Sequence, residues 1–276
     1  MPMNNRLLRP RQTVHPEAAD WANRVRANGG SVSGTTLSAV SKFCASIASA
    51  GIRDRFYRLN LFCGTGLEAC LVPLYRGQSL GGTQFGNTTD TNFNFVSGDY
   101  TETGASGGLV GNGSSKYLQT GFPMNSLPST TDGHAAVYDM TRSSSTAFRG
   151  LVGVNQDAAT GFGVAADNTT YGIWGNFAFV ANNTNGLLLA SRTSSSLLTT
   201  YVNTTAIVTN VNTVTPTATS RTAVVFARTA ISTGAITFYA ADRLGGYSIG
   251  LGMSAAQVSA YHSAMQAIQT ALTRNV

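Results

Sequence analysis

The sequence has 276 residues, and only 11% of them are charged, against a usual share of about 25%. Solubility must therefore come from hydroxyl and amide side chains, and a surface so poor in Lys and Glu favours packing against further copies of the chain. No run of about 18 apolar residues occurs, and the start lacks the apolar segment of a signal peptide. We therefore expect synthesis in a cytoplasm, no export signal and no membrane contact.

The excess positive charge lies at the N-terminal end. Residues 1–58 hold nine basic and three acidic residues, whereas residues 59–276 hold nine of each sign. Residues 1–15 contain no acid and too few apolar side chains to pack alone, so we expect an extended basic arm that a partner orders. The residues expected to make this attachment are Arg6, Leu7, Leu8, Arg9 and Arg11.

Two helices are predicted after the arm. Pro16 suits the first turn of a helix, and Trp21 and Val25 lie on one face of it. Apolar residues over 37–47 follow the spacing of one face of a second helix. These helices make residues 16–77 a helical attachment region.

Short β-prone runs follow, separated by Gly, Asn, Asp and Ser clusters. This alternation of short strands and turns is typical of an antiparallel sandwich, and the number of runs is enough for two packed sheets. The sequence therefore predicts a mainly β fold, with a sandwich over residues 78–276. An earlier stretch, 56–62, is predicted as a strand or an apolar connector. The predicted runs are 92–95, 108–110, 116–119, 135–140, 150–154, 162–165, 172–180, 186–191, 197–202, 206–211, 222–227 and 236–239.

A last helix is predicted over residues 254–272. Ser254 and Gln257 have the spacing of a capping box, which pairs each side chain with the backbone of the other residue. We expect the helix to dock on the core of the sandwich, with docking on a partner as the alternative. Its apolar stripe consists of Val258, Tyr261, Met265, Ile268 and Leu272.

Residues 108–121 resemble the entry strands of laminin-G-like and concanavalin A-like sandwiches, with the sequence Gly-Leu-Val-Gly-Asn-Gly-Ser-Ser-Lys-Tyr-Leu-Gln-Thr-Gly. Residues 222–257 resemble the closing strands and the tail of that fold. The resemblance covers the chain from about residue 80 onward and implies a concanavalin A-like (laminin-G-like) antiparallel sandwich. Gly111 and Gln257 stand where acidic residues are common, and both are expected at the surface.

The preceding region is similar to sequences fused to such sandwiches in virion proteins of tailed bacteriophages. The similarity rests on residues 21–30, 56–64 and 71–77. It implies a structural virion component, such as a capsid decoration, neck or tail appendage, anchored by the arm and displaying the sandwich. The implied partners are other virion proteins and further copies of the chain, with a trimer favoured.

The sequence shows no catalytic pattern. Glycosidases on this fold use two carboxylates about 5–9.5 Å apart, and none of Glu17, Glu68 and Glu102 has a second acid two or four residues further on. The histidines lie outside any nucleophile-elbow pattern, and the three cysteines lack CxxC spacing. We therefore predict that the chain is not an enzyme and that it binds no cofactor and no metal. A calcium ion held by scattered Asp and carbonyl groups is the alternative for the metal. The alternative for catalysis is an acid pair from distant segments, drawn from Asp132, Asp139 and Asp167.

One stretch has the composition of a sugar site. Sugar binding uses an exposed aromatic ring beside amide groups, and the candidate residues are Asn168, Tyr171, Trp174 and Asn176. The competing interpretation, which we favour, places Trp174 in the sandwich core and Tyr171 on a strand face. A glycan-binding adsorption module for a host surface glycan is thus the alternative to a purely structural role, and a glycan hydrolase is the third.

Overall fold

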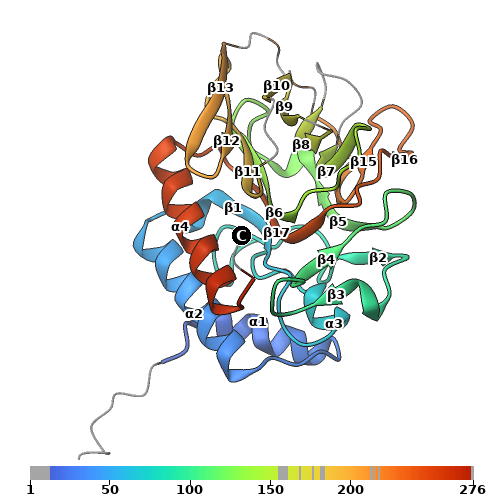
Figure 1. Cartoon of the computed structure of the whole chain (residues 1–276). Coiled ribbons are helices and arrows are strands. Elements are labelled where there is room, and N and C mark those ends of the chain that lie inside the picture. The colour runs from blue at the N-terminus through green and yellow to red at the C-terminus, as the bar shows by residue number, and fades with distance from the viewer. Residues whose placement is uncertain are drawn as a thin grey trace, which may run out of the picture.

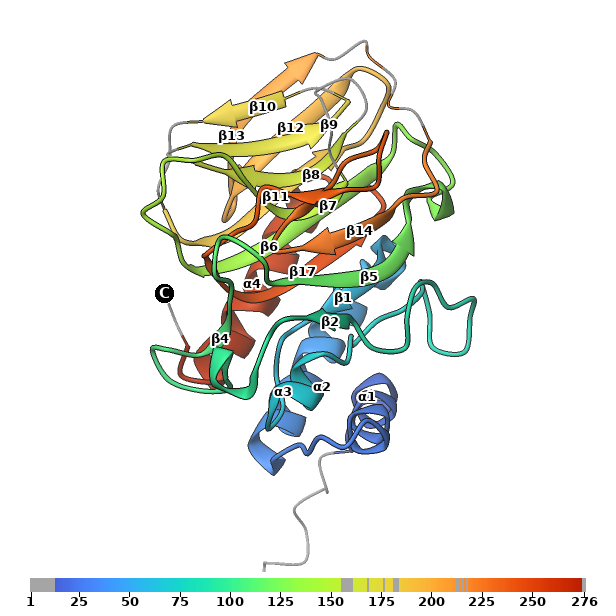
Figure 2. The same cartoon turned by 90° about the vertical axis from the view of Figure 1, so that its right-hand side faces the viewer.

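Three layers make up the molecule: a group of helices, a first sheet and a second sheet, stacked in that order (Figures 1 and 2). The sheets are antiparallel apart from one parallel bridge. This architecture is a concanavalin A-like β-sandwich with helices at both ends of the chain, which confirms the predicted fold class. The computed structural model describes residues 13–154, 161–167, 169–175, 177–180, 184–211, 214, 216 and 218–274.

The helices begin where local capping allows. Pro16 starts the first helix, and the Ser33 hydroxyl accepts a hydrogen bond from the Thr36 backbone at the start of the second. The capping box of Ser254 and Gln257 forms in both directions, and the predicted apolar stripe behind it is buried. The helices are α1 (Pro16–Ala27), α2 (Gly34–Ser49), α3 (Leu67–Cys70) and α4 (Ala255–Ala271), with short 3₁₀ helices at Arg53–Arg55, Ser97–Asp99 and Met124–Ser126.

The first sheet lies between the helices and the second sheet. Its order is β13-β12-β11-β6-β17-β4-β3, and β1 also pairs with β17. One face packs against α1, α2 and α4, and the other faces the core between the sheets. Its strands are β1 (Phe56–Asn60), β3 (Tyr100–Thr101), β4 (Gly108–Val110), β6 (Gly133–Thr141), β11 (Gly186–Arg192), β12 (Leu197–Val202), β13 (Thr205–Val211) and β17 (Arg243–Gly250).

The second sheet forms the outer wall of the sandwich. Its order is β10-β9-β8-β7-β14-β5-β2, and a short hairpin of β15 and β16 attaches to β7. Its strands are β2 (Thr91–Phe93), β5 (Tyr117–Pro123), β7 (Arg149–Val154), β8 (Phe162–Ala166), β9 (Thr170–Trp174), β10 (Phe177–Val180), β14 (Thr222–Val225), β15 (Arg228–Thr229) and β16 (Ile236–Thr237).

Several strands differ from the predicted runs, and the two-residue strands β3 and β15 are absent from them. The run predicted over 172–180 is two strands, β9 and β10, which pair with each other around Gly175 at φ +73°. β17 is absent from the predicted runs, yet it pairs with β1, β4 and β6. Its glycines interrupt the alternation of apolar and polar residues by which strands are recognised in a sequence. One of these glycines is required, because a Cβ at Gly246 would collide with the carbonyl oxygen of Asn60.

The helical region does not form a separate core. β1 is a strand, not a connector, and it pairs with β17 of the sandwich. The apolar cluster on the helix side of the first sheet joins residues 18–75 to side chains of β6, β11 and α4. The predicted boundary at residue 77 therefore does not separate two cores.

Part of the N-terminal charge is internal. Arg58 and Asp90 form an ion pair of 2.6 Å, and both side chains are fully buried. Arg53 pairs with Glu17 at 2.6 Å, and Arg24 donates to the carbonyl oxygens of residues 73 and 74. These three arginines are engaged in contacts within the molecule, so the charge available for attachment is smaller than the sequence count. The arm residues Arg6, Leu7, Leu8, Arg9 and Arg11 lie outside the described residues.

Candidate functional site

Three loops of the sandwich meet and enclose a cavity of about 320 Å³. They are residues 111–116 between β4 and β5, residues 142–148 between β6 and β7, and residues 238–242 between β16 and β17. We call this cavity the loop pocket. Its lining residues are Gly113, Ser114, Ser145, Ala147, Phe148, Arg149, Phe238, Tyr239 and Ala241.

The first and third loops approach closely because of one glycine. A Cβ at Gly111 would collide with the carbonyl oxygen of Ala240, and the Gly111 amide donates to the carbonyl oxygen of Asp242 at 3.1 Å. Gly111 is half-buried. It is therefore a packing position and not the surface position that the resemblance implied.

A buried ion pair joins the second and third loops. Arg149 donates through Nε to Asp242 Oδ2 at 2.6 Å and through Nη2 to Oδ1 at 3.1 Å. The same guanidinium donates to the carbonyl oxygens of Ser143 and Ser145, at 3.2 and 2.9 Å. Such a two-point contact fixes orientation as well as distance. Arg149 thus sets the shape of the loop that carries Phe148.

A second acid lies next to this pair. Asp139, at the end of β6, is fully buried and accepts a hydrogen bond from Arg142 Nε at 3.2 Å. Its Oδ1 has no hydrogen-bond partner among the described residues. Burial, followed by the charge of Asp242, raises the pKa of Asp139 to about 7. The fold thereby creates a carboxyl group that exchanges its proton near neutral pH.

Aromatic rings form the rim of the loop pocket. Phe148 packs edge-on against Phe238, with ring centroids 5.5 Å apart, and the Arg228 guanidinium stacks 3.8 Å from the Phe238 ring centre. Phe238 is 42% exposed and has φ +55°, a conformation that is costly for a side chain of this size. Tyr239 continues the row toward Tyr117, at 6.2 Å between centroids. The rim therefore holds the partly exposed Phe238 ring in a fixed orientation, with the Arg228 guanidinium stacked over it.

The two described residues of the predicted sugar site, Tyr171 and Trp174, point to opposite faces of β9. Trp174 is 1% exposed, packs against Phe162, and donates its indole N–H to the Thr130 carbonyl oxygen at 2.9 Å. Tyr171 points to the other face of β9, is half-buried, and packs against Phe148 at 5.3 Å. The structure follows the competing interpretation, but Tyr171 adjoins the rim of the loop pocket. The other two, Asn168 and Asn176, lie outside the described residues.

The acids named as a possible distant pair have other surroundings, and so does His134, for which no catalytic role was predicted. Asp132 accepts the Gly252 amide, and Asp167 accepts the Tyr171 hydroxyl, each at 2.8 Å. His134 is fully buried and bonded to Ser248 and to a carbonyl oxygen, and burial lowers its pKa to about 4. The acid that lies near Asp139 is Asp242, more than 100 residues along the chain, which spacing rules do not detect.

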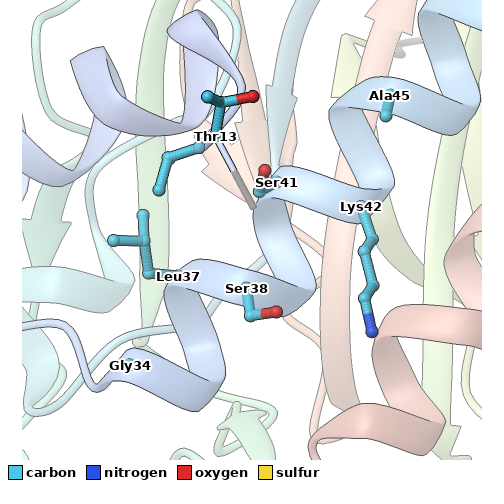
Figure 3. A pocket seen from close by; sticks show the side chains of 8 residues that line it. Thr13, Gly34, Leu37, Ser38, Ser41, Lys42 and Ala45 are labelled. Carbon is cyan, nitrogen blue, oxygen red and sulfur yellow. The ribbon is translucent and has the colours of Figure 1, made fainter. Parts of the chain in front are cut away.

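A second hollow, of about 260 Å³, lies on the helix layer beside α2 (Figure 3). Thr13 and Leu37 lie at one end of it, and Ser41, Lys42 and Ala45 follow along α2. Among the described residues, its lining contains neither an aromatic ring nor an acid. It offers less for specific recognition than the loop pocket, because small side chains provide few directional contacts.

The comparisons with known proteins give only distant likenesses. No family model and no curated protein matches the chain. Among solved structures, a Trypanosoma rangeli sialidase mutant with trans-sialidase activity has 10% identity and a TM-score of 0.45, over 82% of this chain and 39% of that chain. The NanB sialidase of Streptococcus pneumoniae has 13% identity and a TM-score of 0.39, over 55% of this chain and 27% of that chain.

A third similar structure is domain 4 of an extracellular arabinanase from Geobacillus stearothermophilus, in complex with arabinotriose. It has 12% identity and a TM-score of 0.40, over 56% of this chain and 76% of that chain. The chain thus spans about two fifths or less of the two sialidases. Likenesses of this size concern the fold, and the activity of those proteins is not transferred.

The prediction that the chain is not an enzyme is corrected by these comparisons, because sialidases stand among the structures that resemble it. The physical reason lies in how acids assemble. The prediction relied mainly on acids close together in the sequence, whereas the fold brings Asp139 of β6 close to Asp242 of the loop before β17. No helix among the described residues is long and apolar enough to span a membrane.

Proposed function

We propose that this chain is a glycan-binding module and that its ligand enters the loop pocket. The observation that supports this most is Phe238, an exposed aromatic residue held in a left-handed conformation at the rim. Strain of this kind costs of order 1–3 kcal/mol and tends to occur where a site needs a particular geometry. An exposed ring also stacks on the apolar face of a sugar.

The rest of the pocket suits the same ligand. A cavity of about 320 Å³ is at the small end of the range for ligand sites, which fits one or two sugar rings. Ser114 and Ser145 lie in the lining and bring hydroxyl groups that exchange hydrogen bonds with sugar hydroxyls. Arg149 and Asp242 hold the loop backbones in place, so the loops lose little conformational entropy when a ligand binds.

The experiment is a glycan array followed by calorimetry with the strongest ligand. Phe238→Ala should weaken binding by roughly tenfold, the effect of removing one stacked ring. Val96→Ala is the matched control, because Val96 is exposed at 59% and lies outside the loop pocket. An array without any binding above background, or equal affinity of the Phe238 variant, would overturn the proposal. Released reducing ends are measured on the same ligands, and sustained release would change the assignment from binding to hydrolysis.

A finer proposal concerns where the module works. The resemblance to tailed-phage virion proteins and the acid-free arm support display on a particle, with the arm attached to a capsid, neck or tail protein and with several copies side by side. Deleting residues 1–15 should then abolish incorporation into particles, while the soluble variant keeps its far-UV circular dichroism. Normal incorporation of the truncated chain would refute this assignment and leave the glycan proposal untouched.

A further inference from the structure

Three metal-binding side chains meet at the root of the arm. His15, Glu17 and Cys44 bring an imidazole nitrogen, a carboxylate oxygen and a thiol sulfur within 4.8 Å of one another. Glu17 and Cys44 are buried and His15 is half-buried, so the cluster is closest to solvent at the imidazole. It lies beside the hollow of Figure 3, where the Ser41 hydroxyl accepts a hydrogen bond from the His15 amide at 2.8 Å.

The donor set selects the class of metal. Thiolate, imidazole and a single carboxylate are typical ligands of zinc, whereas magnesium and calcium prefer oxygen ligands throughout. Zinc bonds of about 2.0–2.3 Å place the ligands of a tetrahedral site roughly 3.5 Å apart. The three groups are already within 4.8 Å, so small side-chain rotations suffice to close the site.

The present contacts of these side chains are compatible with a cation. Among the described residues, the one hydrogen bond that His15 Nδ1 accepts is long, at 3.3 Å from the Glu17 amide. Arg53 donates to Glu17 Oε1 at 2.6 Å, which leaves Oε2 for a metal. Glu17 brings one negative charge to the cluster, and Cys44 would add a second by releasing its thiol proton as the metal binds.

A fourth polar group faces the same cluster. The hydroxyl of Tyr75 lies next to the Cys44 thiol, and Tyr75 is only 1% exposed. This hydroxyl has no hydrogen-bond partner among the described residues that meets ordinary geometry. A buried hydroxyl without such a partner is an available oxygen donor, either to a metal or to a water bound to it.

We propose that His15, Glu17 and Cys44 form a zinc site that fastens the root of the N-terminal arm to α2. His15 is the last residue of the arm and directly precedes α1, so the metal would fix the direction in which the arm leaves the helix layer. Cys44 supplies the thiolate from the middle of α2, and Tyr75 or a water completes the coordination. This site is separate from the loop pocket and does not depend on glycan binding.

The test measures metal content and coordination. Reduced protein, dialysed with zinc and then desalted, should carry about one zinc per chain by mass spectrometry of the metal. Cobalt should replace it and give a thiolate-to-cobalt charge-transfer band in the near ultraviolet. Cys44→Ser should remove the band and weaken zinc binding roughly tenfold or more.

Two further variants keep the test decisive. Cys70→Ser is the matched control, because Cys70 is also a buried free thiol but lies outside the cluster, and it should keep both the zinc and the band. His15→Gln changes a half-buried residue, so it should lower zinc affinity without unfolding the chain. A wild-type protein that holds no zinc and gives no cobalt band would overturn the proposal, as would full binding by the Cys44 variant.

Discussion

Two buried arginine–aspartate pairs join distant parts of this chain, and they differ in the groups that lie beside them. In the first, Asp90 accepts hydrogen bonds from Arg58 at 2.6 Å, from the Tyr247 hydroxyl at 2.7 Å and from Asn60 at 2.9 Å. Both carboxylate oxygens therefore have partners. This pair fastens β1 to the sandwich.

In the second, the pair of Arg149 and Asp242 is equally well bonded, but it has Asp139 as a neighbour. One oxygen of Asp139 has no partner among the described residues, and the pKa of this carboxyl is raised to about 7. A strained aromatic ring, Phe238, stands on the same group of loops. The first pair has the complete bonding expected of a stabilising contact. The loop region combines a carboxylate oxygen without a described partner and an exposed aromatic residue at positive φ, and binding and catalytic regions commonly carry such features.

The largest loss of stability is expected on breaking the first pair, Arg58 with Asp90. Arg58→Ala would leave the Asp90 carboxylate buried without its cation, which costs about 3–5 kcal/mol of unfolding free energy. Urea denaturation monitored by circular dichroism measures the loss. Arg26→Ala is the control, because Arg26 is exposed and should change stability by no more than about 0.5 kcal/mol. Equal stability of the two variants would contradict a stabilising role for the first pair.

A smaller effect is expected at the second pair. Arg149→Lys keeps the charge but loses the two-point contact, so we expect a loss of about 2 kcal/mol together with a fall in glycan affinity of roughly tenfold or more. Arg221→Lys is the matched control, since Arg221 also donates to loop carbonyl oxygens but does not line the pocket. Unchanged affinity in the Arg149 variant would show that the loops do not depend on this pair.

Asp139 should make stability depend on pH. Its pKa is about 7 in the folded chain and lies near 3.8 otherwise, so between these values the folded state binds more protons than the unfolded state. Stability contributed by this group is therefore complete below about pH 4 and is lost as pH rises toward 7, by at most about 1.4 kcal/mol per pH unit.

The buried His134 acts in the opposite direction between about pH 4 and 6.5, because its pKa is lowered to about 4. The wild-type curve therefore mixes the two groups, and the difference between wild type and Asp139→Asn isolates the carboxyl. The variant should gain stability relative to wild type as pH rises from 4 to 7, measured by urea denaturation at each pH. A difference that stays constant over this range would contradict the raised pKa.

Local signals allowed the sequence to predict much of the fold. The last helix follows from the capping box at Ser254 and a stripe of apolar residues, and most strands follow from short β-prone runs between turns. The pairing of β17 with β1 could not be predicted, because it joins segments about 190 residues apart and runs through glycines. The attachment of residues 16–77 to the sandwich was missed for the same reason.

The candidate site was harder to predict than the fold. Tyr171 and Trp174 have the composition of a sugar site, but strand alternation places them on opposite faces of β9, and composition does not say which face is buried. Arg149 and Asp242 are 93 residues apart, and only the folded chain brings them together. An exposed Phe at positive φ has no sequence signature, since nothing local requires that conformation at Phe238.

The smallest expected change in stability is at Phe238, where two substitutions separate the contribution of the ring to glycan binding from the effect of the backbone on stability. Glycine adopts φ +55° without a Cβ penalty, so Phe238→Gly should be about 1 kcal/mol more stable than Phe238→Ala, while both variants lose glycan binding to a similar extent. The same two substitutions at Asn203, which has φ +57° away from the loop pocket, calibrate the backbone contribution. If Gly and Ala at position 238 were equally stable, the loop would have relaxed without the ring. The conformation would then be a consequence of the Phe238 contacts with Phe148 and Arg228, and not a strain imposed on the ring by the loop backbone.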